Sequence, residues 1–193
     1  MPSHSSSAPA SSTPFVVRPQ TQGHAKAVDT LLDLAFGPGR FAKASYRLRE
    51  GVDPIDSLSF VAEYTNVAGP RGDTEEKLAG SIRYWPIQIG PNAEGLVTDA
   101  LLLGPLAVAP DLQSKGAGLA LMEASLAAAK EQGHRLVFLV GDLPYYQRAG
   151  FSKVPAGQVV MPQPYDPERL LWIALEPGAD AAVAGAMLRP RGL

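Results

Sequence analysis

The stretch Leu101–Lys130, LLLGPLAVAPDLQSKGAGLALMEASLAAAK, decides the fold. Its first residues form an apolar run too continuous for a half-exposed strand, which predicts a buried strand. Pro110 and Asp111 end this run, and a helical pattern opens near Lys115. Glycines in the intervening turn let a ligand approach the backbone, and N–H groups at a helix start favour phosphate oxygens. Tight packing and phosphate binding are therefore the two interpretations of the turn.

Two familiar phosphate-binding loops do not fit this turn. The dinucleotide fingerprint requires a third glycine three residues after Gly118, and that position holds Leu121. The P-loop requires Gly-Lys-Ser/Thr after its spacer, whereas Lys115 precedes Gly116 here. The turn therefore belongs to neither class.

A third pattern fits the turn better. The acyl-CoA signature of the GNAT superfamily of N-acetyltransferases resembles the pattern Leu106-Ala107-Val108-x-Pro110-x-x-Gln113-x-x-Gly116-x-Gly118. At family-like spacing downstream, the segment Tyr145–Phe151, YYQRAGF, is similar to the family's aromatic-Tyr-x-x-x-Gly-Phe motif. The resemblance covers about Phe15–Leu175 and is specific over Leu101–Phe151.

Composition agrees with one globular domain. The chain has 193 residues, of which 46% are hydrophobic and 19% charged. Its net charge of −2 gives no reason to expect nucleic acid or an anionic membrane as partner. It has no cysteine, and its three histidines are scattered, so we expect no metal. No apolar run approaches the roughly 20 residues of a membrane span. The Ser/Pro/Ala-rich start does not resemble a signal peptide, so a cytoplasmic location is expected.

The order of predicted elements is that of a mixed α/β layer fold. Strands are expected at 15–18, 58–64, 78–89, 101–108, 136–140 and 170–175, and helices at 23–36, 40–50, 115–130 and 144–149. A hairpin loop is expected over 66–77. The resemblance implies an α/β fold of the α+β type, with a GNAT-like mixed central sheet of six to seven strands, splayed between the fourth and fifth, and about four flanking helices. Residues 1–13 are expected to be a disordered tail, 14–176 the domain, and 177–193 a tail with weak helical tendency.

Gly104-Pro105 interrupts the central strand. Proline has no N–H to donate, so it is found at bulges or where strand pairing has ended. One interpretation is a simple edge bulge. The other is that this strand splays from Leu136–Val140 and leaves main-chain groups facing a cleft, where the amides of a pantetheine chain could pair with them.

The resemblance implies roles for both motifs. Main-chain atoms of Leu106, Ala107 and Val108 would bind pantetheine, and an N–H near Leu106 would polarise the thioester carbonyl. The pyrophosphate would be bound by Gln113, Ser114, Lys115, Gly116, Ala117, Gly118 and Leu119.

The second motif implies an acid. Tyr146 matches the family's general-acid tyrosine near the thioester sulfur, whereas both tyrosines could instead be core aromatics of a short helix. Arg148 would contact the 3′-phosphate of CoA or remain on the surface. The general base is left open among Glu63, Arg83 and Asp142.

The acceptor side is suggested by cations. Arg40, Lys43 and Arg47 recur at helical spacing and lie in the loop region that borders the acceptor site in the resembled fold. They are either a solvated face or a site for an anionic group of the acceptor, which would favour an amino acid or peptide over a polyamine.

The function implied is transfer of an acetyl group from acetyl-CoA to a primary amine of a small molecule or peptide by direct attack, without a covalent enzyme intermediate. The alternative is a non-catalytic acyl-CoA-binding or sensing module. A nucleotide-binding domain is a weaker third hypothesis. The sequence leaves open the acceptor, the length of the acyl group and the oligomeric state, a homodimer included.

Overall fold

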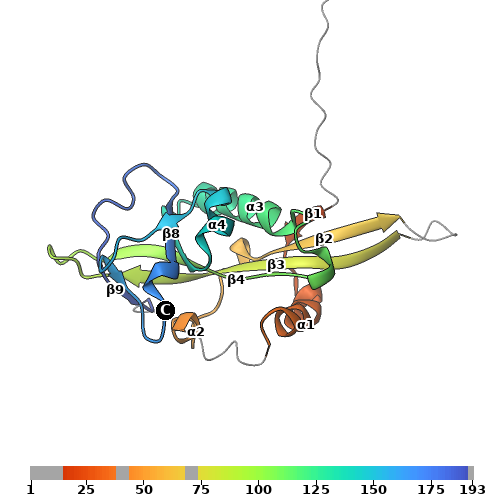
Figure 1. Cartoon of the computed structure of the whole chain (residues 1–193), viewed down its shortest axis with the longest axis horizontal. Coiled ribbons are helices and arrows are strands. Elements are labelled where there is room, and N and C mark those ends of the chain that lie inside the picture. The colour runs from red at the N-terminus through yellow and green to blue at the C-terminus, as the bar shows by residue number, and fades with distance from the viewer. Residues whose placement is uncertain (1–14, 38–43, 68–73, 191–193) are drawn as a thin grey trace, which may run out of the picture.

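A mixed sheet runs through the middle of the molecule. The computed structural model describes residues 15–37, 44–67 and 74–190. Helices α1 (Ala25–Phe36) and α2 (Ala44–Arg47) lie on one side of the long central strands, and α3 (Ala117–Glu131) and α4 (Leu143–Tyr146) lie on the other (Figure 1). The strands are β1 (Phe15–Pro19), β2 (Phe60–Val67), β3 (Thr74–Ile89), β4 (Thr98–Val108), β5 (Leu136–Val140), β6 (Ser152–Lys153), β7 (Val159–Val160), β8 (Leu170–Ala174) and β9 (Gly185–Leu188).

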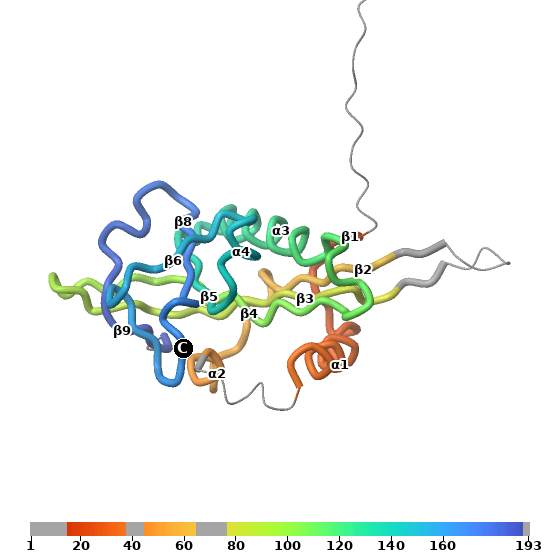
Figure 2. The backbone as a smooth tube through the Cα atoms, viewed as in Figure 1, coloured from red at the N-terminus to blue at the C-terminus, as the bar shows by residue number. Residues whose placement is uncertain are grey.

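Strand pairing confirms the expected mixed sheet. The main path runs β1-β2-β3-β4-β5-β8-β6, which gives the upper predicted number of strands, with β7 and β9 added off this path. All pairs along the main path are antiparallel except β4 with β5, which is parallel. Figure 2 follows the backbone through these strands. The long β2–β3 hairpin corrects the loop predicted over 66–77, because β2 continues to Val67 and β3 begins at Thr74.

The alanine-rich tail corrects another expectation. It contributes strand β9 rather than a weak helix. Strand β2 leaves its edge of β3 at Ile82, and further along that edge β9 pairs with Gln88 and Ile89. Met187 of β9 is buried in the core. The predicted tail after residue 176 therefore includes β9, a strand that pairs with β3.

Pairing on both sides of β4 changes at Gly104-Pro105. On the β3 side Leu103 lies opposite Tyr84 and Leu106 opposite Ile82, so two residues of β4 face one of β3 in a bulge. On the β5 side, pairing is confined to Leu101 with Val137 and Leu102 with Phe138. The strand is therefore bulged, though not at an edge because β4 lies between β3 and β5, and it parts from β5 after Leu102.

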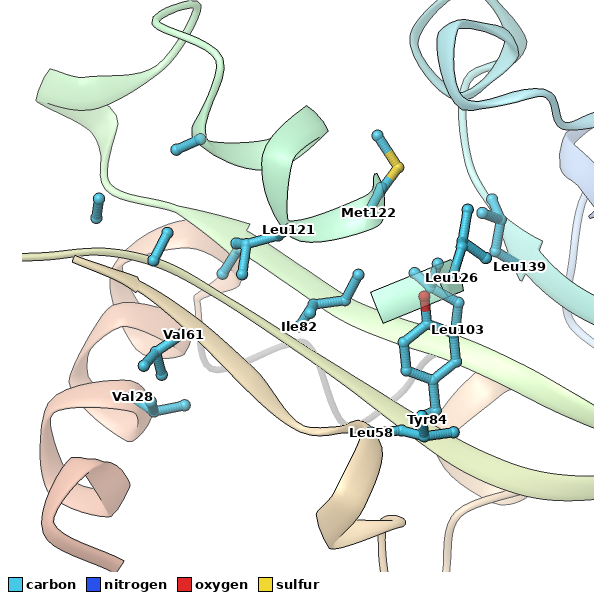
Figure 3. Packing of buried hydrophobic residues seen from close by; sticks show 14 of the residues in the cluster. Val28, Leu58, Val61, Ile82, Tyr84, Leu103, Leu121, Met122, Leu126 and Leu139 are labelled. Carbon is cyan, nitrogen blue, oxygen red and sulfur yellow. The ribbon is translucent and has the colours of Figure 1, made fainter. Parts of the chain in front are cut away.

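Two layers of apolar side chains hold the helices on the sheet. Val28, Leu31 and Leu32 are the buried face of α1, and α3 buries Leu121 and Met122. Figure 3 shows Val28, Leu121 and Met122 packed around the central strands, where the Tyr84 ring reaches toward α3. The Tyr84 hydroxyl is 2.8 Å from the Ser125 hydroxyl, which satisfies both buried groups.

The second helix is shorter than predicted. Among the described residues α2 ends at Arg47, where a helix to Glu50 was expected. The chain turns because Leu48 is buried at 2% exposure and Gly51 adopts a φ of +73°. No helix within residues 15–37, 44–67 and 74–190 combines the length and apolarity needed to cross a membrane.

Candidate active site

The turn before α3 presents unpaired N–H groups. Ser114 and Gly116 both adopt left-handed conformations, with φ of +62° and +99°. The first helical hydrogen bond runs from the Ala120 N–H to the Gly116 carbonyl. The N–H groups just inside the helix therefore have no intrahelical acceptor, and the helix dipole adds positive potential there. This geometry suits an anion such as a phosphate.

A cavity of about 700 Å³, here called the loop cavity, adjoins this turn. It is lined by Leu106, Val108, Gln113, Ser114, Lys115, Gly116, Ala117, Gly118, Leu119, Tyr145, Tyr146 and Arg148. The structure thus gathers nearly all the residues that the two motifs predicted. Ala107 is absent from this lining because its side chain is buried on the opposite face of β4.

Main-chain groups of β4 border the same cavity. The Ala109 N–H donates to the Ala79 carbonyl at 2.8 Å, so this residue directs its main chain toward β3. Alternate residues of an antiparallel strand direct these groups to the same side. Leu106 and Val108 therefore direct theirs away from β3, to the edge from which β5 has parted. An extended ligand can pair with that edge as a strand would.

Two tyrosines follow the end of β5. The Tyr145 hydroxyl occupies the space that a Cβ at Gly118 would need, so the glycine permits this contact. The Tyr146 ring lies against Gly141 in the same way, and its centroid is 5.9 Å from that of Phe151. Burial, with smaller contributions from Tyr145 and Asp142, raises the pKa of Tyr146 to about 12. Burial also raises the pKa of Tyr145. Both hydroxyls are therefore protonated at neutral pH.

A second cavity, the wedge cavity, fills the gap between β4 and β5. Its volume is about 110 Å³. Leu139 and Val140 form the β5 wall and Tyr146 lies at the α4 end. The β4 wall is the bulge, Leu103–Leu106, and Phe36, Ser45, Tyr46 and Arg49 close the side that carries α1 and α2. Tyr146 and Leu106 line both the wedge and loop cavities.

A third cavity, the lower cavity, lies on the side of α1 and α2. It measures about 490 Å³. Its lining consists of Asp29, Leu32, Tyr46, Arg47, Arg49, Glu50, Val52, Pro54, Arg83, Trp85 and Pro105. Tyr46, Arg49 and Pro105 also line the wedge cavity. The three cavities therefore adjoin in series through the sheet, from the turn before α3 to the face covered by α2.

The comparisons with known proteins agree with this arrangement. A family model described as an acetyltransferase (GNAT) domain matches residues 56–153, just over half of the chain. The chain belongs to the GNAT acetyltransferase family. It is accordingly an acyltransferase, which confirms the family suggested by the two motifs. No protein of curated function matches the sequence.

Two solved structures share the fold of this acetyltransferase. The GNAT family N-acetyltransferase YhbS from Escherichia coli, in complex with CoA, has a TM-score of 0.71 and 22% identity, covering 97% of this chain and 98% of its own. A GNAT family acetyltransferase from Brucella melitensis, in complex with acetyl-CoA, has a TM-score of 0.60 and 22% identity, covering 92% and 96%.

The predicted acceptor residues of the acetyltransferase are only partly placed. Arg40 and Lys43 lie outside the described residues. Arg47 lines the lower cavity, and its Nη1 donates to the Gln163 carbonyl at 2.8 Å. Sequence reasoning missed Arg49, which stacks against Trp85. Its position three residues after Tyr46 was the available signal, because that spacing places both on one helical face.

Of the residues considered as a base, only one reaches a cavity. Glu63 binds Arg18 at 2.9 Å and lies 3.3 Å from His24, outside all three cavities. Asp142 is exposed and lies 3.2 Å from Arg169. Arg83 lines the lower cavity, and its Nε donates to Gln20. A guanidinium keeps its proton at neutral pH, so Arg83 is unsuited to act as a base.

Proposed function

We propose that this acetyltransferase transfers the acetyl group of acetyl-CoA to a primary amine of a small molecule or peptide by direct attack. The observation that carries the proposal is the series of cavities through the sheet. Main-chain groups of Leu106 and the hydroxyl-bearing ring of Tyr146 meet where the loop cavity opens into the wedge cavity. A donor entering from one face and an acceptor entering from the other would meet at this point.

The loop cavity suits the donor. The N–H groups at the start of α3 would bind the pyrophosphate, with Gln113, Ser114 and Lys115 beside it. The free edge of β4 over Leu106–Val108 would pair with the pantetheine amides. Arg148 is exposed at the rim of the cavity and would contact the 3′-phosphate. CoA and acetyl-CoA in the two similar structures support this choice of donor.

The chemistry requires one bond to form as another breaks. The neutral amine attacks the thioester carbonyl, whose developing negative charge an N–H near Leu106 would stabilise. The C–N bond forms, the C–S bond breaks, and the sulfur leaves with the bonding pair. Tyr146, protonated because its pKa is raised to about 12, would donate to that sulfur, and its phenolate would then take the proton that the attacking nitrogen loses as the amide forms. The chain contains no cysteine, so no thiol of the protein takes part as a nucleophile.

The proton lost by the incoming ammonium needs an acceptor. Asp29 and Glu50 are the carboxylates that line the lower cavity within the described part of the chain. We propose that one of them takes up this proton through water, since neither lies in the wedge cavity itself.

Thiol release from acetyl-CoA in the presence of a panel of amines tests the proposal. We expect release that depends on the amine, with an N-acetylated product of matching amount. Tight acetyl-CoA binding without amine-dependent release would instead support an acyl-CoA-binding module. Preference for ATP or NAD over CoA would contradict the donor assignment.

A further inference from the structure

Arg49 holds an unusual position for a charged side chain. Its guanidinium carbon lies 4.6 Å from the centroid of the Trp85 ring and 5.1 Å from that of Tyr46. The side chain lines both the wedge cavity and the lower cavity. It therefore stands where an acceptor would pass from one cavity into the other.

Within the described residues Arg49 forms no ion pair, although Asp29 and Glu50 line the lower cavity with it. Its Nε is buried without a hydrogen-bond partner there. The arginines Arg18, Arg135 and Arg169, by contrast, are about half exposed and each pairs with a carboxylate. Burial lowers the pKa of Arg49 to about 10, which still leaves it charged at neutral pH. An unpaired buried charge is costly, and a bound anion would offset that cost.

The distance from Arg49 to the proposed reaction point limits how far the anionic group of the acceptor can lie from its amine. Its Nη2 lies 2.9 Å from where a Cβ on Gly104 would stand. Leu106, whose N–H is the proposed carbonyl donor, follows two residues later, about 7 Å along an extended strand and less across a bulge. If the amine of the acceptor attacks beside Leu106 while its anionic group is bound by Arg49, the two groups are thus only a few bonds apart in the acceptor molecule.

The rest of the lower cavity limits the acceptor's side chain. Leu32, Val52 and Pro54 provide apolar walls beside the Trp85 ring. Asp29 and Glu50 line the same cavity and would repel a second carboxylate. A planar guanidinium fork matches a carboxylate bidentately, which selects that group over a single hydroxyl or amide.

From this geometry we infer that the acceptor is an apolar amino acid, whose carboxylate binds to Arg49 while its amine attacks in the wedge cavity. The inference rests on the proposed acetyl transfer and adds the acceptor class and its binding residue. The carboxylate is unchanged in the reaction. Arg47, whose Nη1 already binds the Gln163 carbonyl, has the secondary role of raising the positive potential at the mouth of the cavity.

The kinetic test compares L-leucine with L-leucinamide in wild type, Arg49→Lys and Arg49→Met. Each substrate is compared between variants, so the different amine pKa values of the two substrates cancel. We expect KM for L-leucine to rise about 10- to 100-fold in Arg49→Met and by less in Arg49→Lys, with little change for L-leucinamide. Arg135→Met, which removes a remote surface charge, is the matched control and should leave both substrates unaffected.

A binding test separates this inference from the proposed function. Calorimetry without acetyl-CoA should detect N-acetyl-L-leucine, but not its amide, in wild type and should lose that signal in Arg49→Met. The Tm of Arg49→Met without ligand should be unchanged or raised, because an unpaired buried charge has been removed. Failure of acetyl-CoA binding, with carboxylate binding intact, would overturn the donor assignment alone.

Several results would overturn the role of Arg49. One is equal turnover of L-leucine and L-leucinamide in wild type with no effect of Arg49→Met. Another is a loss of L-leucine turnover in Arg47→Met as large as that in Arg49→Met. The third is a preference of the enzyme for O-phosphoethanolamine or spermidine over L-leucine. A lowered Tm in Arg49→Met, with the same loss for acid and amide, would mark the residue as a structural support for Trp85.

Discussion

Replacing Tyr146 by phenylalanine removes one hydroxyl from the point where the loop and wedge cavities meet. The ring contacts are retained, including those to Tyr145 at 5.0 Å and Phe151 at 5.9 Å between centroids. No described residue forms a hydrogen bond with the Tyr146 hydroxyl, so its loss leaves no buried partner unsatisfied. We therefore expect the free energy of unfolding to change by no more than about 0.5 kcal/mol.

Turnover should respond very differently from stability. If the Tyr146 hydroxyl protonates the leaving sulfur, kcat should fall about 10²- to 10⁴-fold in Tyr146→Phe. That loss equals about 2.7–5.4 kcal/mol of transition-state stabilisation. The affinity for acetyl-CoA, measured by calorimetry, should stay within about twofold, because the proposed donor contacts are main-chain groups and the α3 turn.

The raised pKa of Tyr146 also predicts the alkaline limb of the pH profile. An acid loses its function as pH rises through its pKa, and that pKa is raised from 10.0 to about 12. The wild-type rate should therefore rise as the amine is deprotonated and show no fall up to about pH 11. Tyr145→Phe, which removes the neighbouring hydroxyl, serves as the comparison. Near wild-type turnover in Tyr146→Phe, or an alkaline fall centred near pH 9, would refute the reasoning.

Three glycines give further predictions. Gly116→Asp should weaken acetyl-CoA binding at least about 100-fold by placing a carboxylate beside the pyrophosphate, whereas Gly157→Asp, at a similar positive φ but outside the cavity, should bind normally in the same calorimetric assay. Gly118→Ala should lower acetyl-CoA affinity about 10-fold by displacing the Tyr145 hydroxyl, and Tyr145→Phe in the same chain should recover most of it; no recovery would contradict the contact. Gly80→Ala, whose Cβ would stand 2.8 Å from a β4 carbonyl oxygen, should cost about 1–3 kcal/mol in urea unfolding, and wild-type stability would contradict that packing.

The parts of the site predicted from sequence are those built by short stretches. The turn before α3 needs only Gln113–Gly118 and the strand preceding it, so its position can be predicted locally. Pro105 likewise signals an interruption, because a missing N–H has the same consequence in any sheet. Segment Tyr145–Phe151 places two tyrosines at the end of β5 by the same local logic.

The parts that sequence reasoning missed depend on distant pairing. Arg49 becomes a partly buried cavity residue because Trp85, on β3, lies against its guanidinium. In the sequence, helical spacing singles out Arg40, Lys43 and Arg47 and gives Arg49 no role. Strand β9 forms because Gln88 and Ile89 offer a strand edge, which periodicity within an alanine-rich tail cannot reveal. The length of the β2–β3 hairpin was not predicted, because polar residues such as Glu75 and Glu76 gave this segment the composition of a loop.

The central claim is that acetyl-CoA binds along the free edge of β4, between the turn before α3 and the gap to β5. Backbone amide NMR during titration with acetyl-CoA tests it most directly. We predict the largest shifts at Leu106, Val108 and Ala117–Leu119, with Ala109 changing little because its N–H already donates to Ala79. Shifts confined to other parts of the sheet, or equal responses to acetyl-CoA and ATP, would contradict the account.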